Sequence, residues 1–412
     1  MLVRSNSVST KEKIIKMLHR ILYQIFEVFQ SLYKYLLKIL HPAQTIQFED
    51  GLTVTISHKI AEGGFSYIFC ATDVNRPQRN YALKRMICGD EEMFHSCRKE
   101  VDVHRRIQAQ NGHGHSNLLY LFHVKFIQET SQRRLCYMLF PLVSGGSLRD
   151  HVTKRNLLSN DLGRVRPWSE RQVLKLFKGI LEGVRGLHNS SLAHCDIKLE
   201  NVLLDQGFED EGNGRGSGSG SGSGAHRDGG DIEMRRGDNN LGIPILMDFG
   251  SARELEVKLV DRRSVLRLTE DAAQYSTICY RAPELFEGGC RHGPLEAPVD
   301  GKVDVWSCGC LLFGMIFGTS PFELEFRQDG STKIVECTHL RVLGGTLPRI
   351  PTVRASLYDH SKDIIDLIQW ILTVDRKDRP NIDEVCDRVE ALLTSATRSR
   401  SRMAFSERGD FV

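Results

Sequence analysis

Apolar side chains recur every three or four residues between residues 11 and 40, which is the spacing of one face of an α-helix. The stretch contains no glycine or proline, and Pro42 follows it. Ser9 or Thr10 is suited to cap its first turn. The pattern predicts an amphipathic helical extension over residues 1–44. Its apolar face is formed by Ile14, Leu18, Ile21, Ile25, Val28 and Leu32.

The predicted extension is also basic. Residues 1–40 contain seven lysines and arginines against two glutamates, a net charge of +5. A basic residue near an anionic bilayer contributes about 1 kcal/mol to membrane association. Three roles therefore stay open for this helix. It could bind an anionic membrane surface through residues 11–40, it could pack on the rest of the protein or pair with another helix in an oligomer, or it could target the chain to an organelle.

From residue 48 the apolar positions alternate with polar ones, which is typical of half-buried strands. Leu52, Val54 and Ile56 form the first such run, and Gly63 and Gly64 interrupt the pattern soon afterwards. A glycine-rich turn lets backbone N–H groups approach phosphate oxygens closely, although a plain hairpin turn is the alternative interpretation.

Composition places the chain among ordinary globular proteins. Its 412 residues suffice for two or three lobes, with 41% hydrophobic and 26% charged residues. A formal net charge of +3 gives no reason to expect nucleic acid as a partner. The eleven cysteines are scattered without metal-ligand spacing, which suits a reducing cytosol. We find neither a signal peptide nor a charge-free run near the roughly 18 residues that a spanning helix needs.

Two further segments are predicted to be disordered. Residues 206–242 contain a glycine and serine tract that cannot bury enough apolar surface to fold. Short apolar runs flank the tract, so we expect an insertion at the tip of a hairpin between two neighbouring strands. The tail 395–412 is rich in serine and arginine, and we expect it to be solvated.

A group of polar residues suits phosphoryl transfer. Asp196 can orient an attacking hydroxyl and accept its proton, and Lys198 can neutralise charge on a moving phosphoryl group. Asn201 can offer an oxygen to a metal, and Asp248, before Phe249 and Gly250, can supply the carboxylate that holds Mg²⁺. Apolar runs beside these residues predict strands that support them.

The segment His194–Asn201 resembles the catalytic loop of protein kinases, and Asp248-Phe249-Gly250 resembles their metal-binding motif. The resemblance implies an α+β, bilobal protein kinase fold, with a small mostly-β N-lobe and a larger mostly-α C-lobe. It places the N-lobe and hinge at residues 45–143 and the C-lobe at residues 144–394, after the helical extension 1–44. It also implies ATP and Mg²⁺ (or Mn²⁺) as cofactors and proteins as substrates.

The resemblance extends to the nucleotide pocket. The glycine-rich turn and the run Tyr81-Ala82-Leu83-Lys84 resemble the loop and strand that hold ATP phosphates. Glu100 is the expected partner of Lys84, with Glu91, Glu92 and Asp102 as rivals. The residues implied to line the pocket are Ile60, Ala61, Gly63, Ile68, Ala82, Lys84, Glu100, Phe140 and Val143.

Motifs further along the chain follow in the order found in protein kinases. Residues 277–284 resemble the segment in which a threonine hydroxyl bonds the catalytic aspartate and lysine of serine/threonine kinases. The resemblance implies that Asp304 braces the catalytic loop backbone and that Arg379 pairs with Glu284.

Finer details resemble the Numb-associated kinase family, closest to its myristoylated and palmitoylated branch, over about residues 48–393. These details include Glu62–Tyr67, Pro141 and Ala272-Ala273-Gln274. The resemblance implies a cytoplasmic kinase, peripheral on endomembranes such as the Golgi, with a role in secretion. The chain departs from that branch at Met1-Leu2, where the glycine needed for myristoylation is absent, so we expect the basic helix to replace the lipid.

Cys195 is a second departure, because kinases commonly have an arginine there that binds a phosphate on the activation segment, which the resemblance places at residues 248–284. We therefore expect activity that does not depend on such a phosphate. The main rival interpretation is a catalytically weak pseudokinase acting as a membrane-associated scaffold, favoured only by Ala61 and Ser66 in two glycine positions. A small-molecule kinase is a third interpretation, and the oligomeric state is left open by the sequence.

Overall fold

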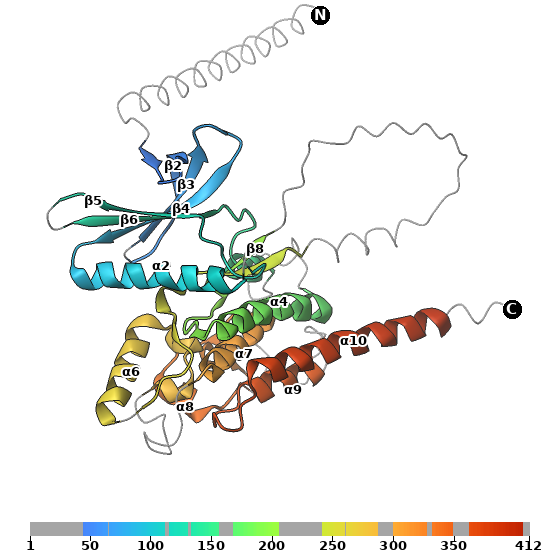
Figure 1. Cartoon of the computed structure of the whole chain (residues 1–412). Helices are drawn as coiled ribbons and strands as arrows, with labels where there is room; N and C mark the ends of the chain where they lie inside the picture. Colours follow the sequence, from blue (N-terminus) through green and yellow to red (C-terminus); the bar gives the residue numbers. More distant parts are fainter. Residues whose placement is uncertain are drawn as a thin grey trace, which may run out of the picture. The chain divides into compact units, whose positions relative to one another are not determined.

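The computed structural model describes residues 44–64, 66–111, 115–130, 133–155, 168–205, 241–259, 261–286, 300–327, 332–348 and 362–406, with side chains to residue 395. The predicted amphipathic helix 11–40 and nearly all of the insertion 206–242 lie outside these residues. Along the described chain, helices and strands follow the mixed order of an α+β protein (Figure 1).

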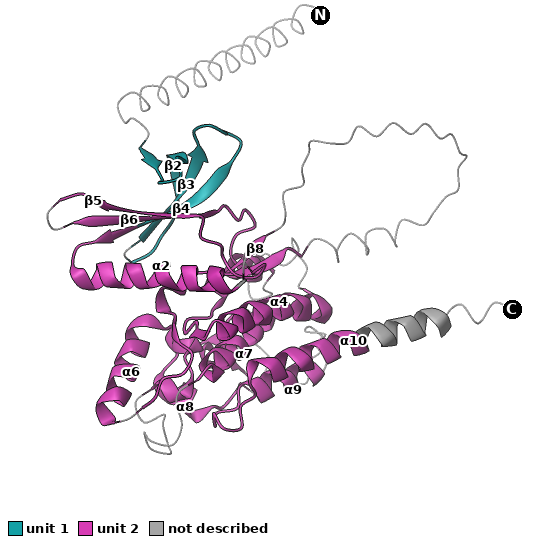
Figure 2. Cartoon of the chain, in the orientation of Figure 1, with its two compact units in different colours: residues 1–85 teal, residues 86–412 magenta. Residues whose placement is uncertain are grey.

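The chain forms two compact units, Met1–Arg85 and Met86–Val412 (Figure 2). The lobe boundary predicted between residues 143 and 144 does not coincide with this division. Residues 86–143 belong to the larger unit because they pack on it. The ring of His104 lies 4.8 Å from that of Phe249, and Leu118 forms a parallel β-bridge with Leu246.

The described part of the first unit consists of strands, as the alternating pattern predicts. It contains β1 (Thr45–Gln47), β2 (Thr53–Glu62), β3 (Ser66–Asp73) and the start of β4 (Asn80–Cys88), in the order β1-β2-β3-β4. The turn between β2 and β3 is closed by a hydrogen bond from the Gly63 N–H to the Ser66 carbonyl at 2.8 Å. Ala61 pairs with Ile68 across this hairpin.

In the second unit, α2 (Glu91–Asn111) precedes the antiparallel pair β5 (His123–Gln128) and β6 (Arg134–Pro141). The hairpin β8 (Val202–Asp205) and β9 (Ile243–Leu246) pairs Val202 with Leu246 and Asp205 with Ile243. This pairing confirms that the two apolar runs flanking the insertion are neighbouring strands. Two short strands, β7 (Leu192–Ala193) and β10 (Arg253–Glu254), are also antiparallel.

Helices form the core of the second unit. The apolar stripe of α4 (Glu170–Asn189) is buried, and a capping box at Ser169 begins the helix. Every residue of α7 (Lys302–Phe317) after the first is buried. In Figure 1, α10 (Ile382–Ser406) lies beside α4 and next to α9 (Lys362–Ile371), which contacts α7. The described residues of this unit also form α3 (Leu148–Arg155), α6 (Arg262–Tyr275), α8 (His339–Gly344), β11 (Leu324–Phe326) and β12 (Thr332–Ile334).

The prediction of a disordered tail from residue 395 is wrong for its first part, because α10 continues to Ser406. Alanine, arginine and methionine favour helices, and no glycine or proline interrupts the sequence before Gly409. This helical propensity outweighs the charge and serine content of the segment. Residues 407–412 lie outside the described part of the chain.

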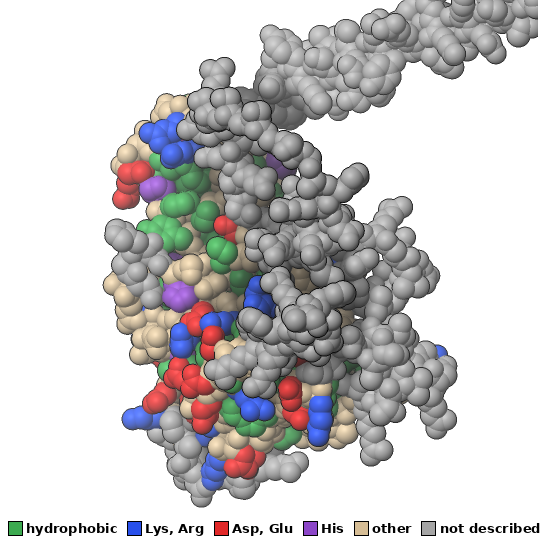
Figure 3. Space-filling view, turned by 90° about the vertical axis from the view of Figure 1, so that its right-hand side faces the viewer, with side chains coloured by type: hydrophobic (Ala, Val, Ile, Leu, Met, Phe, Trp, Pro, Cys, Tyr) green, Lys and Arg blue, Asp and Glu red, His purple; other side chains and the backbone are tan. Residues whose placement is uncertain are grey.

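Acidic and basic side chains intermingle on the described surface shown in Figure 3. Within the described residues, none of the helices is both long and apolar enough to cross a bilayer.

Candidate active site

The backbone of residues 194–196 is held by a buried carboxylate. Asp304, in α7, accepts the N–H of His194 and the N–H of Cys195, both at 2.8 Å. Cys195 has a left-handed backbone with φ of 66°, which costs a side-chain-bearing residue about 1 kcal/mol. The two bonds offset this cost and confirm that Asp304 braces the loop.

The charge of Asp304 is stabilised inside the protein. Its side chain is fully buried, and burial alone would raise its pKa. The hydrogen bond and positive potential of His188, whose Nε2 lies 3.0 Å from Oδ2, together with the N–H donors, hold the pKa of Asp304 below its ordinary value. Asp304 therefore remains an ionised acceptor beneath the loop.

Asp196 is the centre of a compact polar cluster. Its Oδ1 accepts the hydroxyl of Thr277 at 2.7 Å and the Thr277 N–H at 2.9 Å. Its Oδ2 accepts the Lys198 ammonium at 2.7 Å, and the same ammonium donates to the Thr277 hydroxyl at 2.9 Å. These contacts confirm that the threonine bonds the aspartate and the lysine.

Asn201 is fixed against the same aspartate. Its Nδ2 donates to the Asp196 carbonyl at 2.8 Å and to Asp196 Oδ2 at 3.2 Å. Because both bonds use the amide nitrogen, Oδ1 is the atom that remains to act as an oxygen ligand. Asn201 lies in the short 3₁₀ helix η1 (Leu199–Asn201), and its own carbonyl accepts the N–H of Met247 at 2.9 Å.

Asp248 has a left-handed backbone, with φ of 65° and ψ of 77°, before the short helix η2 (Phe249–Ser251). A Cβ at Gly250 would lie 3.6 Å from Asp248 Oδ1 and 3.6 Å from Glu100 Oε2. The two carboxylates therefore both lie close to the same glycine. Glu100 lies in α2 and is only 2% exposed. Its side chain is therefore not part of a solvated face of that helix, and its burial agrees with a role as the partner of a cation.

Aromatic rings fix the segment next to Asp248. Phe249 is buried, with its ring 5.6 Å from that of His194 and 4.8 Å from that of His104. His194 accepts the N–H of Asp196 on Nδ1 at 3.2 Å and donates from Nε2 to the Met247 carbonyl at 3.1 Å. His194 thereby ties the loop of Asp196 to the strand before Asp248.

The donor set fits a hard divalent cation. The described residues contain no cluster of three or more histidine, cysteine or acidic side chains arranged for a metal ion. One carboxylate and one amide oxygen, from Asp248 and Asn201, are the sparse protein set with which Mg²⁺ is usually bound when phosphates and water complete its shell. The residues present therefore fit Mg²⁺ held together with a nucleotide.

The segment after Thr277 is anchored at a second buried pair. Arg379 donates from its two terminal nitrogens to Glu284 at 2.7 and 3.0 Å, and its guanidinium lies 4.9 Å from the Trp306 ring. The arginine also donates to three backbone carbonyls, those of Lys302, Thr373 and Val374. This geometry confirms the predicted pairing of Arg379 with Glu284.

Cys195 has no features of a reactive thiol. It is 7% exposed, and burial raises the pKa of its thiol to about 12, although Lys99 and Arg253 act in the opposite direction. A thiol with such a pKa is protonated at neutral pH, so Cys195 is a small buried side chain in the loop.

The residues implied to hold ATP are divided between the two units. In the first unit, Ala82 and Lys84 alternate with the buried Leu83 in β4, and the others lie on or beside the β2–β3 turn; these are Ile60, Ala61, Gly63 and Ile68. In the second unit, Phe140 is buried at the end of β6 and Val143 is half-buried after it. The pairing of Lys84 with Glu100 spans the two units and stays a prediction.

Sequence reasoning missed one element of the site, the helix α6 that precedes Thr277. A signal for it was present: Asp261 and Ser264 form a capping box, and Leu268 and Ala272 recur at helical spacing and are buried. It also missed the contribution of His188 and His194 to the support of the loop.

Comparison with known proteins agrees with this geometry. The sequence matches a family described as “Protein kinase domain” over residues 54–389. It is 29% identical over 387 residues to a probable serine/threonine-protein kinase of Dictyostelium discoideum, covering 87% of this chain and 99% of that protein. It is also 29% identical over 338 residues to serine/threonine-protein kinase 16 of Rattus norvegicus and of Homo sapiens, covering 82% of this chain and 90% of each relative.

Proposed function

Because the chain belongs to the protein kinase family and is an ATP-dependent serine/threonine protein kinase, we propose that Asp196 orients the hydroxyl of a protein serine or threonine for transfer of the γ-phosphoryl group. The observation that carries this proposal is the cluster in which Asp196 contacts Thr277, Lys198 and Asn201. Phosphoryl transfer depends mostly on positioning and charge stabilisation, which this cluster is built to supply.

Each polar side chain has a role in the proposal. Asp196 accepts the proton of the attacking hydroxyl, while Lys198, 2.7 Å from it, stabilises negative charge on the transferred group. Thr277 fixes the positions of the lysine and the aspartate relative to each other because its hydroxyl hydrogen-bonds to both. Asp248 and Asn201 would hold Mg²⁺, which would supply electrostatic neutralisation of the phosphates.

The metal role is tested with purified full-length protein and γ-labelled ATP. We expect Asp248→Asn to abolish transfer to serine and threonine peptides, whereas Asp366→Asn, an exposed aspartate on α9, leaves the rate unchanged. Thermal unfolding of both variants checks that they fold. Full transfer by Asp248→Asn would contradict the assignment.

We also propose that the chain belongs to the Numb-associated kinases and works at membrane surfaces in secretory or endomembrane traffic. The similarity to serine/threonine-protein kinase 16 and the run Ala272-Ala273-Gln274 support this placement. The net charge of +5 on residues 1–40 supports a peripheral association with anionic lipid.

The membrane proposal is tested by co-sedimentation with vesicles of phosphatidylcholine, with and without phosphatidylserine. The full chain is expected to bind the anionic vesicles, and a chain that lacks residues 1–44 is expected to stay in solution. A matched variant, Lys11→Glu with Lys13→Glu and Lys16→Glu, keeps the apolar face and should lose binding. Equal sedimentation of all three proteins would contradict the proposal.

Finally, we propose that activity does not need phosphorylation of the activation segment. Cys195 stands where an arginine would bind such a phosphate, and Thr277 already contacts Asp196 through its unmodified hydroxyl. Phosphatase-treated protein should therefore retain its turnover. Complete loss of turnover after treatment, restored by rephosphorylation, would contradict the proposal.

A further inference from the structure

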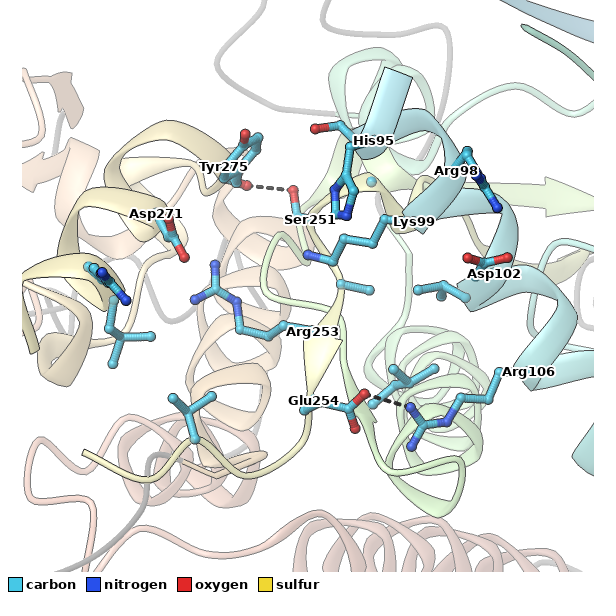
Figure 4. Close-up of a pocket in the computed structure, with 18 of the residues that line it drawn as sticks. His95, Arg98, Lys99, Asp102, Arg106, Ser251, Arg253, Glu254, Asp271 and Tyr275 are labelled. Carbon is cyan, nitrogen blue, oxygen red and sulfur yellow. Dashed lines mark hydrogen bonds and ion pairs between the residues drawn. The ribbon is translucent and has the colours of Figure 1, made fainter. Parts of the chain in front are cut away.

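A pocket of about 1170 Å³ lies between α2, residues 250–254 and α6 (Figure 4). It is separate from the cluster around Asp196, and charged side chains of both signs line it. Because α6 leads directly to Thr277, an interaction across this pocket can affect the active site.

Two cations enter the pocket from neighbouring elements. Lys99 comes from α2, and Arg253 comes from β10, where it pairs with Ala193 of β7 just before the catalytic loop. Burial and then the charge of Arg253 lower the pKa of Lys99, so the two cations are close enough to oppose each other. In the described part of the chain neither forms an ion pair, and Arg253 Nε is buried without a hydrogen-bond partner.

Two other acids of the pocket, Glu254 and Asp102, lie near arginines of α2, although the charge of Glu254 also acts on Lys99. Glu254 pairs with Arg106 at 2.7 Å, and Asp102 lies 3.8 Å from Arg105. Asp271, on α6, faces the two cations across the pocket: its carboxylate points toward Arg253 in Figure 4, and its charge acts on Lys99. A carboxylate thus stands opposite a cationic pair whose charges also act on the Cys195 thiol.

The neighbour of Asp271 connects α6 to the active site. Ala272 is buried, and its carbonyl accepts the N–H of Ser276 at 3.1 Å and the Ser276 hydroxyl at 2.6 Å. Ser276 in turn accepts Arg281 at 2.8 Å, and it directly precedes Thr277. The Tyr275 carbonyl accepts the Ser251 hydroxyl at 2.5 Å, which joins the end of α6 to η2.

We infer that Asp271 is a positioning residue whose carboxylate balances Lys99 and Arg253, holds α6 against α2 and β10, and thereby keeps Thr277 in contact with Asp196. The inference rests on the proposed phosphotransfer function and adds a residue distant from the reacting atoms.

The experiment compares phosphatase-treated full-length variants at saturating ATP and peptide. Asp271→Asn is expected to lower kcat about tenfold, with little change in the KM for ATP, because the aspartate touches no substrate. Asp271→Glu should restore most of the rate because it returns the carboxylate. Glu270→Gln, the same change at the adjacent exposed residue of α6, should leave kcat unchanged.

A double-mutant cycle identifies the partner of the carboxylate. If Asp271 acts through Arg253, the variant with Asp271→Asn and Arg253→Gln should be no slower than the worse single variant. Arg267, one turn before Asp271 on α6, is the matched control partner. Three results would each overturn the inference. One is an unaltered kcat in Asp271→Asn. The others are independent, multiplicative losses of kcat when Asp271→Asn is combined with Arg253→Gln, and coupling of Asp271 to Arg267 instead. An inactive wild-type protein would instead overturn the proposed function.

Discussion

Thr277 donates its hydroxyl hydrogen to Oδ1 of Asp196 at 2.7 Å, and its backbone N–H reaches the same oxygen at 2.9 Å. A single residue of the activation segment therefore fixes one oxygen of the proposed catalytic carboxylate, while Lys198 fixes the other. The orientation of Asp196 depends as much on the segment after α6 as on its own loop.

Replacing Thr277 by valine should lower kcat/KM for peptide by roughly tenfold to a hundredfold, because hydrogen bonds to charged groups contribute about 1.5–3 kcal/mol. Steady-state kinetics with a serine peptide measures the effect. Thr277→Ser keeps the hydroxyl and serves as the control. A valine variant as fast as the serine variant would show that the hydroxyl does not position Asp196.

Replacing Asp304 by asparagine should lower the free energy of unfolding by about 3 kcal/mol, because a buried charge that accepts several donors is lost. The pKa of Asp304 is lowered in the folded protein, so its charge stabilises the fold above the unfolded pKa of about 4. That contribution disappears as the pH falls through the folded pKa.

Urea unfolding of both proteins between neutral and acid pH measures this linkage. The difference in unfolding free energy between wild type and Asp304→Asn should be constant at neutral pH and shrink below about pH 4. A difference that does not depend on pH would show that the ionised form of Asp304 is not the stabilising one.

Arg379 and Glu284 form a buried pair, with side chains 0% and 7% exposed. Arg379→Lys should lower the free energy of unfolding by about 3 kcal/mol, because lysine cannot reproduce the two parallel bonds and leaves Glu284 poorly paired. The ion pair of Lys178 with Glu390 is the surface comparison, at 39% and 56% exposure. Lys178→Ala should cost less than about 1 kcal/mol in the same denaturation measurement. Similar losses of unfolding free energy in Arg379→Lys and Lys178→Ala would show that burial does not make the first pair more important for stability.

Burial raises the pKa of Cys195 to about 12 and that of the half-buried Cys337 to about 11. Because the thiolate is the reactive form, iodoacetamide should label both residues slowly at pH 8 in folded protein and quickly in urea. Peptide mass spectrometry after timed labelling provides the two rates. Rapid labelling of Cys195 in the folded protein would reveal a reactive thiol.

The sequence predicted the site largely because its chemistry is tied to short spacings. Asp196, Lys198 and Asn201 lie within one loop, and the support from Asp304 and the pair of Arg379 with Glu284 followed from the kinase resemblance. The α+β class was also predicted, from the same resemblance.

Features that depend on packing were not predicted. The division at Arg85 results from contacts such as that of His104 with Phe249, which pair residues far apart in the chain. The charge group of Lys99, Arg253 and Asp271 likewise joins three separate elements. No spacing in the sequence marks such a group, because an exposed charged residue on a helix is ordinary until its neighbours are known.

The most direct test of the central claim is the single-turnover rate of γ-phosphoryl transfer from ATP to a serine peptide, compared between wild type and Asp196→Asn. Asparagine nearly preserves the shape but cannot accept the proton. We predict a rate lower by at least about a thousandfold with peptide and nucleotide still bound. Equal rates in the two proteins would show that Asp196 does not carry the reaction.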